Sequence, residues 1–261
     1  MRAVRMKGKV YLVGAGPGHA ELVTVKACRV LGEADVVLHD DLVNPEILQF
    51  ASASAHVENV GKRCGRAHAS QAEIHSKMIA FANRGLAVVR LKGGDPLLFG
   101  RAGEEMEALR EAGIEFEVVP GVTAACAAAA AARISLTDRR FASKLTILTN
   151  HRCGAKTASL EGTVDENTTV IVYMPGTNYQ ELSARLIEAS FAPDTPCVIV
   201  SSATSDRQEI RASALADLAE MTNLPAPALL IVGRVAGEYQ QGQSVVRAAA
   251  EPCVEETREQ A

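Results

Sequence analysis

The residues most capable of chemistry lie in the segment Leu91–Arg101, which reads LKGGDPLLFGR. An apolar run, Leu86–Val89, precedes it and is typical of a buried strand. Gly93 and Gly94 allow a ligand to approach the main chain closely, because neither residue has a Cβ. Asp95 then offers a carboxylate at the carboxyl end of the strand, the edge where ligands bind in open α/β sheets. An ordinary strand–turn–helix corner accounts for the same four residues about equally well.

A second glycine-rich loop, Gly14–Gly18, follows a short apolar strand predicted over Lys9–Val13. A dinucleotide-binding loop needs glycine at its first, third and sixth positions, and His19 occupies the sixth. Pro17 also lacks a main-chain N–H group that could donate a hydrogen bond to a pyrophosphate. The sequence therefore predicts a ligand-facing loop that is not a nicotinamide cofactor site.

Five segments follow one another along the chain in an informative order: Gly14–Ala27, Ala34–Val43, Val60–Arg63, Val88–Glu105 and Val119–Ala124. In this order they resemble the uroporphyrinogen-III C-methyltransferases, which belong to the S-adenosylmethionine-dependent tetrapyrrole methylases. The resemblance covers roughly residues 8 to 236 and is denser in the first half. It implies methylation of uroporphyrinogen III at C2 and C7, giving precorrin-2 for the sirohaem and cobalamin branch, with S-adenosylhomocysteine as the second product.

The alternation of strand-like and helix-like segments predicts βαβ units and an α/β fold. We expect a largely parallel first lobe over residues 8–121, a mixed second lobe over 122–236, and a fraying tail over 237–261. The resemblance implies a cofactor in the cleft between the two lobes, and a homodimer. The expected strands are Val10–Val13, Val36–Leu38, Ala87–Leu91, Phe116–Val119, Lys144–Thr149, Thr168–Met174, Pro196–Ser201, Gln208–Ala212 and Ala228–Val232. The expected helices are Glu21–Gly32, Gln71–Arg84, Glu104–Ala112, Tyr179–Ala189 and Ser213–Met221.

By resemblance, the cofactor contacts fall on two glycine-rich loops and on positions further along the chain. Asp95 can accept hydrogen bonds from hydroxyl or amino groups, and Met174 and Leu98 can supply apolar contact. Other roles are open for some of them: Met174 suits a core position, and Thr123 suits a helix cap. The implied contacts are Pro17, Gly93, Gly94, Asp95, Leu98, Thr123, Ala124, Met174, Ala203 and Gly233.

Asp40 and Lys62 match the family positions proposed for acid–base or substrate roles. A substrate with eight carboxylates needs arginine and lysine around it, since guanidinium groups bind carboxylates bidentately. Arg63 and Arg101 are therefore candidate substrate contacts, with Arg139 and Arg140 as weaker ones. Asp40 also suits a turn, and Lys62 a solvated loop.

Several positions depart from the family pattern. His39 stands where tyrosine is usual, so it is a candidate substrate contact or proton shuttle, or a structural residue. Asp138 replaces a common histidine, and Pro175 a common glycine. Ser202-Ala203-Thr204 replaces Asn-Gly-Thr. These changes put the identity of the methyl acceptor in more doubt than that of the cofactor.

Composition excludes several classes of protein. The net charge of −4 argues against a nucleic-acid partner, and the first ten residues lack the apolar run of a signal peptide. Six scattered cysteines form no C-x-x-C pair, so we expect neither disulfides nor a metal site. The longest small-residue run, Ala124–Ala132, is too short to cross a membrane. We therefore expect a cytoplasmic enzyme that binds a small-molecule tetrapyrrole.

Two alternatives remain on the sequence. One is a later precorrin methyltransferase of cobalamin synthesis, against which the full Lys92–Pro96 motif and the Lys62-Arg63 pair argue. The other is a cofactor-binding protein whose substrate site has drifted. The sequence does not distinguish sirohaem from cobalamin as the destination of the product, and it leaves open which residue acts as the base.

Overall fold

A computed structural model describes residues 7–61, 70–150 and 164–239 of the chain. The chain forms two compact units, the first being Met1–Ala128 with Ser202–Gln208, and the second Ala129–Ser201 with Glu209–Ala261. The first unit thus extends beyond residue 121, where we expected the boundary. It also takes in one loop from the C-terminal half of the chain. Most of the expected tail, 237–261, lies outside the described residues.

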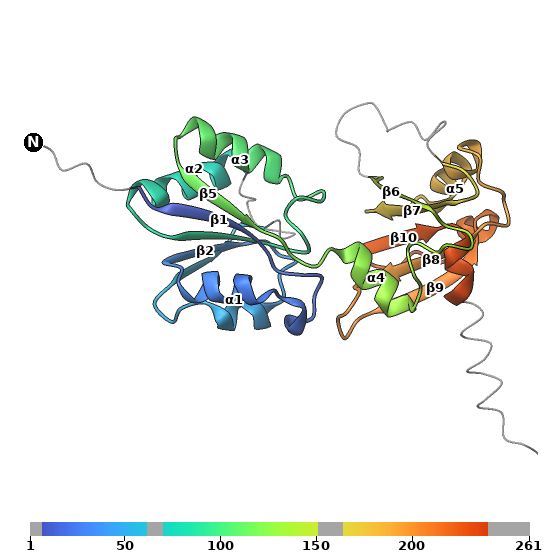
Figure 1. The fold of residues 1–261 in the computed structure, drawn as a ribbon, viewed down its shortest axis with the longest axis horizontal. Coiled ribbons are helices and arrows are strands. Elements are labelled where there is room, and N and C mark those ends of the chain that lie inside the picture. Colours follow the sequence, from blue (N-terminus) through green and yellow to red (C-terminus); the bar gives the residue numbers. More distant parts are fainter. Residues whose placement is uncertain (1–6, 62–69, 151–163, 240–261) are drawn as a thin grey trace, which may run out of the picture. The chain divides into compact units, whose positions relative to one another are not determined.

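The first unit contains a sheet in which every strand is parallel to its neighbours (Figure 1). The strand order β3-β2-β4-β1-β5 places β4 at the centre. All five carboxyl ends therefore lie at one edge of the sheet. The strands are β1 (Lys9–Gly14), β2 (Val36–His39), β3 (His56–Asn59), β4 (Val88–Lys92) and β5 (Glu115–Val119).

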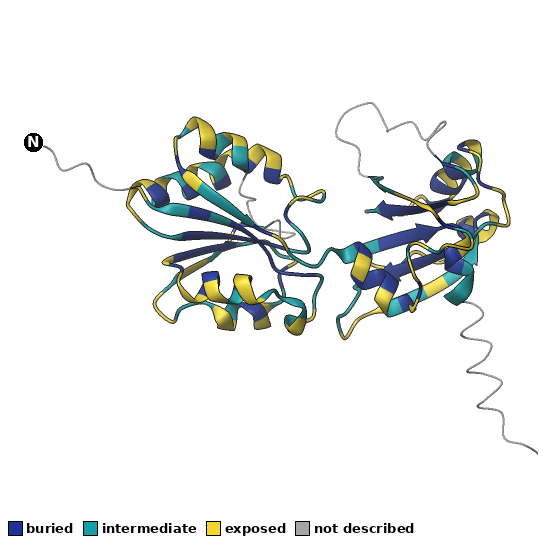
Figure 2. Cartoon of the chain, viewed as in Figure 1, coloured by how far each residue is buried: buried dark blue, intermediate teal, exposed yellow. Residues whose placement is uncertain are grey.

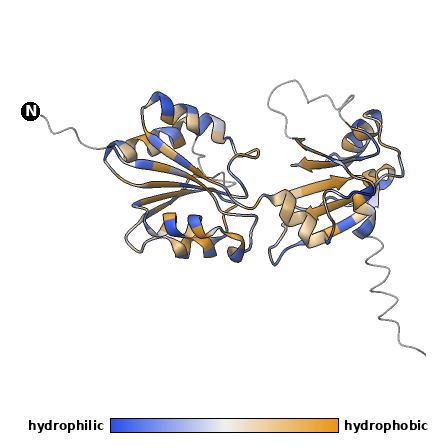
Figure 3. Ribbon diagram, in the orientation of Figure 1, coloured by the Kyte–Doolittle hydropathy of each residue, from blue (hydrophilic) through white to orange (hydrophobic). Residues whose placement is uncertain are grey.

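Helices cover both faces of this sheet, as Figure 1 shows. Helix α1 (Val25–Gly32) packs on one face with the 3-10 helix η2 (Pro45–Phe50). Helices α2 (Gln71–Asn83) and α3 (Ala102–Glu111) pack on the other. Strands β1, β2 and β4 are largely buried, while the helices expose their polar sides (Figures 2 and 3). Burial of both sheet faces explains why the strands read as continuous apolar runs.

Two local expectations for the first unit were wrong. The single helix expected over Glu21–Gly32 is divided into η1 (Ala20–Leu22) and α1, because the Thr24 side chain caps α1 by accepting from the Ala27 N–H. Strand β3 was not predicted, since its sequence His-Val-Glu-Asn is polar and mostly exposed.

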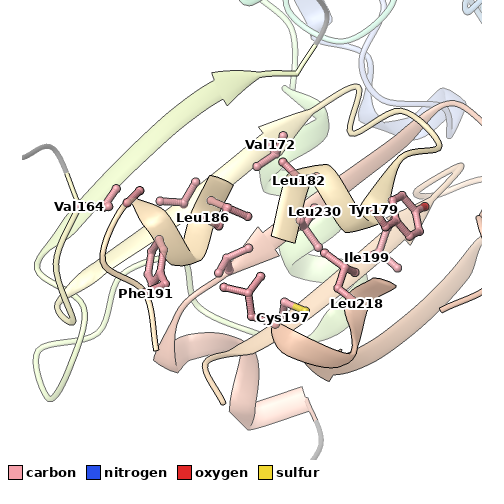
Figure 4. Close-up of a cluster of buried hydrophobic side chains, with 14 of the residues drawn as sticks. Val164, Val172, Tyr179, Leu182, Leu186, Phe191, Cys197, Ile199, Leu218 and Leu230 are labelled. Carbon is pink, nitrogen blue, oxygen red and sulfur yellow. The ribbon is translucent and has the colours of Figure 1, made fainter. Parts of the chain in front are cut away.

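The second unit contains a mixed sheet of order β6-β7-β10-β8-β9, as expected. Only β6 and β7 pair in parallel; the other neighbours are antiparallel. Helix α5 (Tyr179–Glu188) and η3 (Ala216–Glu220) pack over an apolar core that includes Leu186 and Ile199 (Figure 4). A longer helix expected over Ser213–Met221 is reduced to η3, because β9 continues to Ala214. The strands are β6 (Lys144–Thr149), β7 (Thr168–Tyr173), β8 (Pro196–Ser201), β9 (Glu209–Ala214) and β10 (Ala228–Val232).

The expected class, two α/β lobes with one parallel and one mixed sheet, is confirmed. Helix α4 (Ala124–Ala132) crosses from the first unit to the second, and η4 (Arg234–Ala236) follows β10. Within the described ranges, every helix is too short or too polar to span a bilayer. The same ranges hold no group of three or more His, Cys, Asp or Glu side chains placed to bind a metal ion.

Candidate functional site

The two glycine-rich loops of the first unit meet at the carboxyl edge of its sheet. Gly94 donates its N–H to the Gly16 carbonyl at 2.6 Å, and Gly16 donates to the Gly94 carbonyl at 3.2 Å. Beside this bridge, the Ala15 N–H donates to the Lys92 carbonyl at 2.8 Å. Main-chain pairing thus extends past the ends of β1 and β4 and holds both loops in register.

A third loop, after β5, packs closely against the main chain of these two at its glycine. A Cβ on Gly121 would lie 2.3 Å from the Gly94 carbonyl oxygen, and one on Gly14 would lie 2.6 Å from the Gly121 nitrogen. By contrast, a Cβ on Gly94 would have only the Ala124 nitrogen within 4 Å, at 3.8 Å. The glycines at 14 and 121 therefore serve loop-to-loop packing, whereas Gly94 presents an open side next to the start of α4. Gly93 is closer to a side chain, since its Cβ would lie 3.1 Å from the Leu42 Cβ.

Asp95 uses both carboxylate oxygens on the main chain. Oδ1 accepts from the Leu97 N–H at 2.8 Å, and Oδ2 accepts from the Gly121 N–H at 3.0 Å. The second bond joins the loop after β4 to the loop after β5. Asp95 therefore organises this edge of the sheet, and each oxygen keeps a second lone pair for another donor.

The remaining cofactor candidates of the first unit surround the same loops. Pro17, Leu98, Thr123 and Ala124 are all half-buried. Ala203 lies in Ser202–Gln208, the segment that belongs to the first unit. Its carbonyl oxygen would lie 3.2 Å from a Cβ on Gly18. Next to it, the Thr204 hydroxyl accepts from the His19 N–H at 3.1 Å. Sequence reasoning placed Ala203 in the second lobe, but this contact packs it against the first glycine-rich loop.

The Asp40 carboxylate lies at the end of β2 and forms an ion pair with Arg90 of β4. The Arg90 side chain is only 2% exposed, and Asp40 is 28% exposed, so the pair lies at the boundary between the core and solvent. His39 is half-buried, with its Nδ1 3.0 Å from the Asp40 carbonyl oxygen. The sheet thus holds Asp40 at the same edge as Asp95, as expected for residues that follow parallel strands.

A buried charge cluster lies behind Asp40. Glu105 of α3 is fully buried, and its Oε1 accepts from Arg90 Nε and from Lys92 Nζ, each at 3.0 Å. Burial, and then the neighbouring Arg90 cation, lower the pKa of Lys92, although Glu105 opposes this. We call Asp40, Arg90, Lys92 and Glu105 the β4 charge cluster.

The substrate-side candidates are only partly described. Arg101 forms a bidentate pair with Glu104 at 2.8 and 2.7 Å, and both side chains are about half exposed. Hydrogen bonding to Arg101 lowers the pKa of Glu104. Lys62 and Arg63 lie outside the described residues, so their predicted roles are untested.

In the second unit, Met174 follows β7 with a left-handed backbone, φ being +50°. Asn150 holds both flanks of this residue: its N–H donates to the Tyr173 carbonyl at 3.0 Å and its Nδ2 to the Pro175 carbonyl at 2.8 Å. Arg185 of α5 donates to the Asn150 Oδ1 at 2.6 Å and fixes the amide. The Met174 side chain is 43% exposed, so it is not a core residue.

Gly233 is buried, with φ at +133°, and a Cβ there would lie 2.9 Å from the Thr168 carbonyl oxygen. A larger residue at position 233 would clash with the main chain of the second unit, so packing there favours glycine. Asp138, the departure from a family histidine, closes a turn: its carboxylate accepts from the Arg140 N–H at 2.8 Å and from the Arg140 guanidinium at 2.9 and 2.8 Å. Arg140 also pairs with Glu238 at 2.6 Å. This guanidinium, one of the weaker candidates for binding a substrate carboxylate, is therefore already paired with two carboxylates of the protein.

Comparison with known proteins identifies the family. A profile described as Tetrapyrrole (Corrin/Porphyrin) Methylases matches residues 9–219, most of both units. The chain belongs to the tetrapyrrole methylase family. Among solved structures, a uroporphyrin-III C-methyltransferase from Thermus thermophilus, complexed with S-adenosyl homocysteine, is 36% identical with a TM-score of 0.77. That match covers 88% of this methylase and 100% of the Thermus chain.

Curated relatives differ in length. The uroporphyrinogen-III C-methyltransferase of Pseudomonas aeruginosa is 44% identical over 233 residues, covering 88% of this chain and 95% of that protein. The siroheme synthase of Psychrobacter sp. is 43% identical over 233 residues, but the match covers only 48% of its length. This methylase therefore spans about half the length of the siroheme synthases that it matches.

Sequence reasoning missed the role of the charged residues inside the methylase's central strand. Arg90 and Lys92 were read only as part of a motif, although both lie in β4, where all five residues are buried. Two cations in an otherwise apolar strand are themselves a signal, because buried charges need partners. The partner, Glu105, follows thirteen to fifteen residues later and is recognisable only once α3 is packed on β4.

Proposed function

We propose that this chain is an S-adenosylmethionine-dependent methyltransferase that methylates uroporphyrinogen III at C2 and C7, giving precorrin-2. The observation that carries the proposal is the 44% identity to the Pseudomonas aeruginosa enzyme, which extends over 95% of that protein. The carboxyl edge of the first sheet supports it, because three loops there present main-chain groups and acidic side chains to one place.

The residues at this edge fit the proposed cofactor. S-adenosylmethionine carries hydroxyl, amino and carboxylate groups, and free main-chain groups on glycine loops suit such a ligand. The open side of Gly94, next to the Ala124 nitrogen, leaves room for the cofactor, whereas main-chain atoms occupy the corresponding space at Gly14 and Gly121. The proposed contacts are Pro17, Gly93, Gly94, Asp95, Leu98, Thr123, Ala124 and Ala203 of the first unit, and Met174 and Gly233 of the second.

When bound, S-adenosylmethionine supplies an activated methyl group on a positively charged sulfur. The protein then has to align donor and acceptor and exclude water. After the methyl group joins a ring carbon, the substrate loses a proton elsewhere, and a positioned base accelerates that loss. Asp40 and Lys62 are the proposed acid–base residues.

Recognition of the substrate carboxylates is proposed for Arg63 and Arg101, with His39 beside the ring system. Arg101 is preorganised by Glu104, and a substrate carboxylate would have to compete with that pair or share it. Guanidinium–carboxylate pairing is favourable because it is bidentate and charge-assisted. A homodimer and a cytoplasmic location also remain proposals.

Anaerobic incubation with uroporphyrinogen III and S-adenosylmethionine, followed by mass spectrometry, tests the activity. Two added methyl groups are expected. No transfer, combined with binding of S-adenosylhomocysteine, would instead favour a cofactor-binding protein with a drifted substrate site. Transfer only to an already methylated precorrin would favour a later enzyme of cobalamin synthesis.

A thermal-shift assay tests the cofactor separately from turnover. A ligand at about 100 times its Kd stabilises a protein by about 2.7 kcal/mol through mass action. We expect this response to S-adenosylhomocysteine. A response to NAD in its place would contradict the proposal.

A further inference from the structure

The β4 charge cluster is unusual in its burial. Arg90 and Lys92 are 2% and 3% exposed, and Glu105 is 0% exposed. Taking charges out of water is costly, and apolar residues of similar size often replace a buried ion pair without loss of stability. Stability alone therefore does not account for four charged side chains at this place.

Glu105 is the hub of the cluster. Its Oε1 accepts from Arg90, from Lys92 and, at 3.4 Å, from Gln71 Nε2 of α2. Its Oε2 is buried and has no hydrogen-bond partner among the residues that the structure describes. Three donors, two from β4 and one from α2, hold this oxygen in place and so fix the orientation of the Glu105 carboxylate.

Arg90 transmits this constraint to the sheet edge. Its Nε donates to Glu105, and its Nη1 donates to the carbonyls of Leu38 and Leu91 at 3.3 and 3.2 Å. Its Nη2 is left for Asp40, with which it forms the ion pair. Because a guanidinium is planar and rigid, fixing Nε and Nη1 also fixes the direction in which Nη2 points.

We propose that Glu105 is a positioning residue for methyl transfer: it orients Arg90, and Arg90 holds the Asp40 carboxylate in place at the carboxyl edge of the sheet. This inference rests on the proposed role of Asp40 in turnover. Glu105 itself does not touch the substrate, since it is fully buried behind β4. If Glu105 only neutralised the buried charges of Arg90 and Lys92, its loss would not act on turnover through Asp40. If Glu105 positions Asp40, its effect on kcat should depend on the presence of the Asp40 carboxylate.

A double-mutant cycle distinguishes charge compensation from positioning. Asp40→Asn is expected to lower kcat by about 10²-fold or more, the range of a positioned acid or base. Glu105→Gln keeps the size of the side chain and is expected to lower kcat by about 10-fold or more, because small displacements of reacting groups are costly. In the double variant, kcat should be no lower than in Asp40→Asn alone. The Kd for S-adenosylhomocysteine should change little in any of the three.

Glu107→Gln provides a matched control, since it makes the same replacement on the exposed side of the same helix. It should leave kcat and Tm close to those of the wild type. If Glu105→Gln does not fold, Arg90→Lys tests the same link, because lysine keeps the charge but cannot donate to all four acceptors. Its effect on kcat should also vanish in the Asp40→Asn background.

The outcomes are distinguishable. Wild-type protein that transfers no methyl group refutes the proposed function. If Asp40→Asn lowers kcat but the Glu105→Gln effect multiplies with it, the proposed function stands and the positioning role is overturned. If Glu105→Gln lowers kcat while Asp40→Asn does not, the route through Asp40 is likewise overturned.

Discussion

Replacing Asp95 by alanine removes a side chain that joins the loop after β4 to the loop after β5. Its carboxylate accepts from the Leu97 N–H at 2.8 Å and the Gly121 N–H at 3.0 Å. Both glycine-rich loops depend on this edge, since Gly94 pairs with Gly16 through the main chain. We therefore expect Asp95→Ala to loosen the loops that are proposed to bind the cofactor.

The magnitude follows from the two bonds. A hydrogen bond to a charged group contributes about 1.5–3 kcal/mol, and the half-buried position of Asp95 favours the lower end. Loss of both bonds should lower the free energy of unfolding by about 3 kcal/mol, and Asp95→Asn, which keeps one acceptor oxygen, by about half of that. If ordering the loosened loops on binding costs about 1.4 kcal/mol, the Kd for S-adenosylhomocysteine rises about tenfold.

Isothermal titration calorimetry with S-adenosylhomocysteine measures the affinity, and urea unfolding measures stability. Asp165→Ala is a suitable control, because Asp165 accepts from the Asn167 N–H at 3.0 Å and the Thr168 hydroxyl at 2.8 Å in a turn of the second unit. It should lower stability without changing affinity. An unchanged Kd in Asp95→Ala, or a change no larger than in Asp165→Ala, would refute the reasoning.

Three further predictions follow from named contacts. Asp40→Ala should cut turnover by about 10²-fold or more with the affinity for S-adenosylhomocysteine nearly intact; steady-state kinetics and calorimetry on the same variant check both. Asn150→Ala should weaken that affinity several-fold, because Nδ2 of the amide donates to the Pro175 carbonyl beside Met174, which has a left-handed conformation. Asn150→Asp keeps the acceptor for Arg185 but loses this donor, so it should lose affinity as Asn150→Ala does, and full affinity in Asn150→Asp would contradict the bracketing role. Hydrogen bonds from Lys26 and then Lys9 lower the pKa of Glu117 from 4.5 to about 2. Its charged form therefore stabilises the fold above pH 4.5, and that contribution is lost as the pH falls towards 2. Glu117→Gln should be less stable than the wild type at pH 7 in urea unfolding, with the difference narrowing over this range; a difference independent of pH would exclude the ion pairs as its cause.

Much of the fold could be predicted from the sequence, because its signals are local. The apolar runs Val36–Leu38 and Ala87–Leu91 predicted strands that the structure shows as β2 and β4, shifted by one residue at most at each end. The Ser70–Glu73 capping box is a local feature of the same kind at the start of α2. Asp95 and Asp40 were placed at the carboxyl edge from their positions after strands, before any neighbour was known.

Other features depend on which elements lie next to each other. Strand β3 has little apolar pattern, and only its pairing with β2 makes it a strand. The segment Ser202–Gln208 joins the first unit, although it lies far along the chain in the second half. Neither feature has a signal within its own residues.

The sequence by itself determined which chemical groups this methylase has at its sheet edge, because residue types and strand ends can be read locally. The tertiary structure decided what those groups do. Asp95 turned out to bind two main-chain N–H groups, and Glu105 to gather Arg90 and Lys92 beneath Asp40. A charged side chain acquires its partner from whichever element packs against it, and that packing joins residues whose separation in sequence carries no pattern.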